Sequence, residues 1–190
     1  LGTEAADGVH TFNDGSGTAA HTAGSVPMDA IPECIARRGI IYPLQSFTSG
    51  REVNLSDVPL FIEAGDEATR EQLVEIASMI SSCVECADSE RRRVIHLAGV
   101  FVNNFTNQLY ALGGDIMRDA GLSYDMLKPL IEETAAKAVE AAHPRNVQTG
   151  PAVRVDKAVA ERHVAMLGEA NQQEIYKLLT DYIWQTSRKI

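Results

Sequence analysis

One stretch of the sequence without charged side chains holds the residues best suited to chemistry. No charged residue occurs between Arg93 and Asp115, and the stretch includes His96, Asn103 and Asn107. Helical spacing places these three on one polar but uncharged face, whereas a solvated helix face normally carries Lys and Glu. Imidazole exchanges protons near neutral pH, and carboxamides can hold a substrate's polar atoms. We therefore expect His96 and Asn103 to be catalytic and Asn107 to bind substrate.

The same face also has a purely structural interpretation. Buried amides must be hydrogen-bonded, and neighbouring helices could supply the partners as well as a substrate could. A lone histidine is often a satisfied core residue. The opposite side of the helix is apolar and is expected to be a core stripe, made of Val94, Ala98, Phe101, Phe105, Leu109, Leu112 and Ile116.

Two loops could meet the polar face. Tyr42 and Gln45 follow a short apolar run, and ligands of open α/β sheets bind at the carboxyl ends of strands. Thr149 and Arg154 lie in a loop between two predicted helices, where the guanidinium could clamp a carboxylate or phosphate. These four residues are candidate substrate contacts.

Arg154 has an alternative role. Acidic residues that could pair with it instead are Glu132, Glu133 and Asp156.

The elements that must position these residues change character near residue 88. Apolar runs at 39–42, 58–64 and 83–87 predict strands, and an amphipathic helix over 67–81 makes the last two a β-α-β unit. After Asp88, which can cap a helix, only helices are predicted, over 89–119, 123–142, 156–167 and 171–188. We expect an irregular segment over 1–19, an α/β region over 20–88 and an all-helical domain over 89–190.

Composition excludes several function classes. The net charge of −9 argues against nucleic-acid binding, and the run Arg91–Arg93 is interpreted as a solvated helix start. The uncharged stretch contains too many amides for a bilayer, so no membrane partner is expected. Cys83 and Cys86 form an isolated C-x-x-C motif. We interpret them as two small side chains near the end of a strand rather than as ligands of a metal site. Three sparse cysteines fit a reducing cytoplasm.

Five segments of the sequence occur in this order: HTAGS (21–25), YPLQSF (42–47), HLAGVFVNNFTN (96–107), PLIEET (129–134) and QTGPAVR (148–154). Together they resemble an uncharacterised bacterial family described as NADP oxidoreductases, which is distantly similar to pyrroline-5-carboxylate reductases and β-hydroxyacid dehydrogenases. The resemblance implies a Rossmann-like N-terminal domain and a helical C-terminal domain similar to that of 6-phosphogluconate dehydrogenase. It implies NADP or NAD as cofactor of the complete protein, with the nicotinamide approaching near Ala23 and Gly24.

The chain departs from these relatives at three places. Asn103-Asn104 resembles the Asn pair of β-hydroxyacid dehydrogenases, but Val100 stands where they have a catalytic Lys, so His96 is the candidate substitute. Tyr42 stands where prephenate dehydrogenases have the His of a His-Pro loop. No G-x-G-x-x-G motif is present, so we expect a truncated chain that keeps a partial Rossmann-like sheet, lacks a full cofactor site and is inactive alone.

Three functions therefore stay open. The first is an oxidoreductase part acting on a small polar substrate. The second is a helical interaction module without catalysis, in which the uncharged helix face joins two copies into a homodimer through the long helices. The third is a non-catalytic ligand sensor built on the same cleft.

Overall fold

The computed structural model describes residues 12–13 and 17–187, and its contacts divide the chain into two compact units. The first is Leu1–Thr106 and the second is Asn107–Ile190. The division comes later than the change near residue 88 that the sequence indicates. Strands end near residue 88, but the helix that follows packs on the sheet, so the contacts separate further along the chain.

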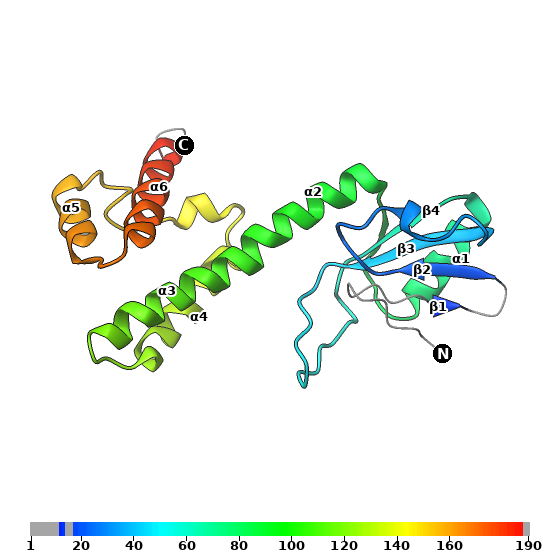
Figure 1. Ribbon diagram of the computed structural model, residues 1–190, viewed down its shortest axis with the longest axis horizontal. Coiled ribbons are helices and arrows are strands. Elements are labelled where there is room, and N and C mark those ends of the chain that lie inside the picture. Colours follow the sequence, from blue (N-terminus) through cyan, green and yellow to red (C-terminus); the bar gives the residue numbers. More distant parts are fainter. Residues whose placement is uncertain (1–11, 14–16, 188–190) are drawn as a thin grey trace. The chain divides into compact units, whose positions relative to one another are not determined.

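A five-stranded mixed sheet forms the centre of the first unit (Figure 1). The strand order follows the sequence, with β2 parallel to β3, β3 antiparallel to β4, and β4 parallel to β5. The predicted β-α-β unit is confirmed, because α1 (Glu67–Ser78) connects the parallel strands β4 and β5. The strands are β1 (Phe12–Asn13), β2 (Thr18–His21), β3 (Arg37–Pro43), β4 (Leu60–Ala64) and β5 (Val84–Cys86).

Alternation along β4 builds a small core on each face of this sheet. Leu60 and Ile62 face α1 and pack with its Leu73, whereas Phe61 between them joins Tyr42 on the other face. Ile95 of the following helix packs against this second cluster. The carboxyl end of β3 and the helix are therefore held together by apolar contact.

The predicted long helix is present over Ser89–Asp119, but it is not regular throughout. It consists of α2 (Ser89–Gly99), the π-helical segment η2 (Val100–Phe105) and α3 (Thr106–Asp119). Asp88 caps it as expected, since its carboxylate accepts a hydrogen bond from the Arg91 amide at 2.8 Å. The π-helical turns were not predicted.

Helices are the only regular secondary structure in the described part of the second unit. After η3 (Tyr124–Leu127) come α4 (Lys128–Glu140), η4 (Pro144–Val147), α5 (Lys157–Met166) and α6 (Ala170–Ser187). These bounds match the predicted helices, including the cap of α5 by Asp156. The fold class, α/β followed by all-α, is confirmed.

The expected irregular segment 1–19 lies mostly outside the described residues, and within the described part Phe12–Asn13 pairs with β2, which begins at Thr18. Another expectation from the sequence is wrong. The apolar stripe of the long helix was expected to be core, yet Phe101 and Val94 keep 60% and 63% of their surface exposed. None of the described helices is long and apolar enough to cross a bilayer.

Candidate functional site

A cavity of about 250 Å³ lies at the carboxyl end of β3, between the loop that follows it and the long helix. It brings together four of the site residues predicted from the sequence, Tyr42, Gln45, His96 and Asn103, with Asn104 beside them. Its lining contains no Asp, Glu, Lys or Arg side chain. The remaining lining residues are Leu44, Ser46, Gly99, Val100 and Val102.

A tyrosine–histidine pair forms one wall of this cavity. The Tyr42 hydroxyl lies 3.3 Å from Nδ1 of His96, and the two rings meet edge to face with centroids 6.1 Å apart. Gly24 packs against both, since a Cβ there would come within 2.6 Å of His96 Nδ1 and 2.7 Å of Tyr42 Cζ. Only glycine lets the loop after β2 approach this closely.

The phenol in this hydrogen bond has a perturbed pKa. Burial raises the pKa of the Tyr42 phenol above its usual value, and the nearby Arg92 charge offsets this only in part. Tyr42 is therefore protonated at neutral pH. Among the described residues, Nε2 of His96 has no hydrogen-bond partner, so this atom is free to exchange a proton with a bound molecule.

The loop that carries Gly24 is fixed at both ends by His21. Nδ1 of this buried histidine accepts the Ala23 amide hydrogen at 3.2 Å, and Nε2 lies 3.3 Å from the Pro27 carbonyl oxygen. These contacts require the neutral tautomer that carries its hydrogen on Nε2. Burial lowers the pKa of His21, which favours that neutral form.

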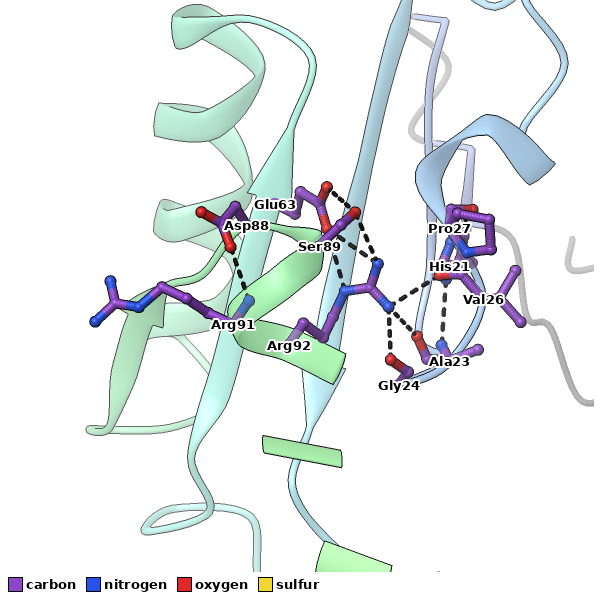
Figure 2. A network of polar contacts seen from close by, with 10 residues as sticks. All are labelled: His21, Ala23, Gly24, Val26, Pro27, Glu63, Asp88, Ser89, Arg91 and Arg92. Atoms are coloured by element: carbon purple, nitrogen blue, oxygen red, sulfur yellow. Dashed lines mark hydrogen bonds and ion pairs between the residues drawn. The ribbon is translucent and has the colours of Figure 1, made fainter. Parts of the chain in front are cut away.

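The same loop is held from its other side by Arg92, which is 1% exposed (Figure 2). Its Nη1 donates to the carbonyl oxygens of Ala23, Gly24 and Val26 at 3.1, 2.7 and 2.9 Å. Its Nε and Nη2 bind Oε2 of Glu63 on β4 at 3.1 and 3.0 Å. Glu63 thus pairs the charge of Arg92, and the loop carbonyl oxygens and the Ser89 hydroxyl accept its remaining hydrogen bonds.

Sequence reasoning missed Arg92, because the basic run was interpreted as a solvated helix start. That interpretation holds for Arg91 and Arg93, which are exposed, and is wrong for Arg92. Arg92 precedes His96 by four residues, so helical spacing puts both on one side of α2. This spacing is the one signal in the sequence that could have identified it.

The other predicted residues lie as follows. Ala23 and Gly24 belong to the loop held by Arg92, and Gln45 accepts the Ser46 amide hydrogen through Oε1 at 2.7 Å. Asn107, Thr149 and Arg154 belong to the second unit and are exposed. Their substrate contacts stay predictions.

Two alternatives raised by the sequence can be compared with the contacts. Within the described part of the chain, Arg154 forms none of the ion pairs that the sequence suggested. Cys83 and Cys86 are free thiols, Cys83 directly before β5 and Cys86 at its end. The described residues bring no three His, Cys, Asp or Glu side chains together as a metal site.

Comparison with known proteins relates the chain to one sequence family and to two solved structures. Residues 58–183 match the family described as "Domain of unknown function (DUF2520)". The crystal structure of "putative NADP oxidoreductase BF3122" from Bacteroides fragilis is 42% identical with a TM-score of 0.83, over 87% of this chain and 64% of that one. Protein TM1727 from Thermotoga maritima is 21% identical with a TM-score of 0.73, over 90% of this chain and 68% of that one, and shares the fold. Among curated proteins no match was found.

Proposed function

The chain belongs to the DUF2520 family, and we propose that it forms the substrate side of an NAD(P)-dependent oxidoreductase that acts on a small, polar, anionic substrate in the cytoplasm. The Bacteroides fragilis relative, which carries an NADP oxidoreductase name, supports the reaction class. The chain spans 64% of the length of that relative, so the activity belongs to the proposal. The observation that carries it is the Tyr42–His96 pair beside Asn103 in one cavity.

The residues of the cavity fit a nicotinamide and an anionic substrate. The lining offers imidazole, phenol and carboxamide groups and no carboxylate that would repel a negative charge. The loop at Ala23 and Gly24 lies directly behind the Tyr42–His96 pair. When bound there, the nicotinamide would supply or accept the hydride.

The chain's own residues would supply the proton. We assign Nδ1–H of His96 as donor to the Tyr42 oxygen, which leaves Nε2 as the atom that gives or takes a proton. This arrangement keeps the same hydrogen bond in both protonation states of His96, so the ring does not have to turn. Asn103 and Asn104 would hold the oxygen or nitrogen atoms of the substrate through their carboxamides.

Substitution in the full-length protein tests this assignment. NADPH oxidation with a panel of small 2-oxo acids and cyclic imines gives the turnover. His96→Ala should lower kcat by about a hundredfold or more, the usual contribution of a positioned acid or base, and Asn103→Ala should lower it less. Tyr42→Phe keeps the ring and removes only the hydroxyl, so it isolates the hydrogen bond.

The second unit offers a matched control. His163 also pairs with a tyrosine, since its Nδ1 lies 2.8 Å from the Tyr176 hydroxyl. His163→Ala should leave kcat unchanged. Equal turnover of the wild type, His96→Ala and Asn103→Ala would refute the site.

We propose homodimerisation as a second function of the same helices. No residue in the described part of the second unit, 107–187, is buried, although a folded unit of this size needs a core. On the long helix, large apolar side chains before, within and after the π-helical segment keep 42–63% of their surface exposed: Val94, Leu97, Phe101, Phe105, Leu109 and Ile116. A second copy of the chain would cover this stripe, because homodimer interfaces are apolar at their centre.

Light scattering coupled to size-exclusion chromatography tests this proposal. The expected mass is twice the 20.6 kDa of one chain. Phe101→Glu should shift the protein toward monomer, whereas Met79→Glu, on an even more exposed apolar side chain at the end of α1, should not. A wild-type monomer at high concentration would contradict it.

A further inference from the structure

The contacts of Arg92 fix the direction of two peptide groups. None of the described peptide bonds is cis, and in a planar trans peptide the N–H points opposite to the C=O. Because the carbonyl oxygens of Ala23 and Gly24 point toward the Arg92 guanidinium, the amide hydrogens of Gly24 and Ser25 point away from it. Neither amide has an acceptor among the described residues.

Two neighbouring positions of this loop provide no free amide hydrogen. The Ala23 amide donates to His21. The peptide group whose Val26 carbonyl oxygen binds Arg92 has no amide hydrogen, because the next residue is Pro27. Ser25 is exposed, so a ligand can reach its backbone, whereas Gly24 is buried and packs against Tyr42 and His96. Two adjacent N–H donors pointing the same way form a concavity that favours an anionic oxygen.

We propose that Arg92 is a positioning residue that holds the loop so that the Gly24 and Ser25 amides bind an oxyanion of the ligand. The inference deepens the proposed function and rests on it, since the oxyanion would be a phosphate of the nucleotide or a carboxylate of the substrate. Arg92 itself does not touch the ligand, because all its donors are taken by Glu63, Ser89 and the loop.

The buried ion pair explains why arginine is needed here. One planar guanidinium reaches the Glu63 carboxylate on one edge and three carbonyl oxygens on the other. A lysine ammonium has only three donors and no planar fork, so it cannot hold both sides at once. Arg92→Lys therefore keeps the charge and loses the orientation of the loop.

Amide chemical shifts of the 15N-labelled chain test the proposal. Nicotinamide mononucleotide and succinate carry the two candidate oxyanions, and nicotinamide riboside lacks the phosphate. We expect a saturable downfield shift of the Gly24 and Ser25 signals with one of the two anions and none with the riboside. Arg92→Lys should weaken the binding about tenfold, and Arg91→Lys, on the exposed neighbour, should leave it unchanged.

The other outcomes overturn the inference. A riboside that shifts both signals as the mononucleotide does would assign the amides to an uncharged group. Equal affinity of the wild type and Arg92→Lys for the anion would refute the role of Arg92. The absence of any shift of the Gly24 and Ser25 signals with all three probes would refute the role of the amides. If Arg92→Lys does not fold, Ser89→Ala, which removes a hydroxyl that binds both Glu63 and Arg92, should weaken binding instead, and unchanged affinity would overturn it. The His96 turnover test is independent of all these results.

Discussion

Gly24→Ala should separate the Tyr42–His96 pair by adding a single methyl group. The new Cβ would lie 2.7 Å from Tyr42 Cζ and 2.6 Å from His96 Nδ1, about 0.7 Å short of ordinary contact. If that displacement fell on the hydrogen bond, its 3.3 Å would become about 4.0 Å, beyond hydrogen-bonding distance. Tyr42 is only 8% exposed, so its ring has little room to move. Overpacking of this kind costs about 1–3 kcal/mol.

Urea denaturation and the His96 Hε1 chemical shift measure the two consequences separately. Gly24→Ala should lower the unfolding free energy by that amount and move the imidazole signal. Gly168→Ala is the control, because a Cβ there meets nothing within 4 Å, and it should change stability by less than about 0.5 kcal/mol. In Gly99→Ala the new Cβ would lie 3.3 Å from the flexible Leu44 side chain, so its loss of unfolding free energy should be between those of the other two variants. A Gly24→Ala protein with wild-type stability and an unmoved signal would refute this account of the site.

Two further predictions concern the buried groups around the loop. Because burial lowers the pKa of His21 in the folded state, the unfolded chain binds the proton first as the pH falls. The stability that this group confers should be complete above about pH 6.5 and decline below it, and urea denaturation of His21→Gln should show a flatter pH dependence than the wild type. Glu63→Gln should cost about 3 kcal/mol, because it leaves the Arg92 charge buried without a partner. A loss of unfolding free energy below about 1 kcal/mol would show that the loop carbonyl oxygens alone are enough to stabilise the buried Arg92 charge.

Local sequence patterns predicted the elements of the fold well. The run at 58–64 is apolar because β4 is covered on both faces, and its Leu60 and Phe61 serve two different clusters. Asp88 and Asp156 marked helix starts because a capping carboxylate acts within three residues of itself. β2 escaped prediction, because Thr-Ala-Ala-His has no strand signature and its place depends on pairing with β3.

The grouping of the candidate site residues in one cavity was predicted in part, for a related reason. Tyr42, His96 and Asn103 could be placed together, because strand ends and helix faces follow from local periodicity. The role of Arg92 could not, because its partners Glu63 and Gly24 are 29 and 68 residues away in the sequence. A buried ion pair is formed by tertiary contacts. Local composition does not reveal such contacts, so it predicts that every arginine in a charged run is exposed to solvent.

The π-helical segment shows why extrapolation along the long helix is limited. Over Val100–Phe105 the turns are wider than α-helical ones, and the Thr106 hydroxyl donates to the Phe101 carbonyl oxygen at 3.0 Å. An inserted π turn displaces everything after it by about one residue around the axis, so Asn107 cannot be assigned to the face of His96 by counting in steps of 3.6. Asn103 and Asn104 lie inside the segment and line the cavity. Because π turns are less stable than α-helical ones and recur at functional sites, their position here independently favours the cavity as the site.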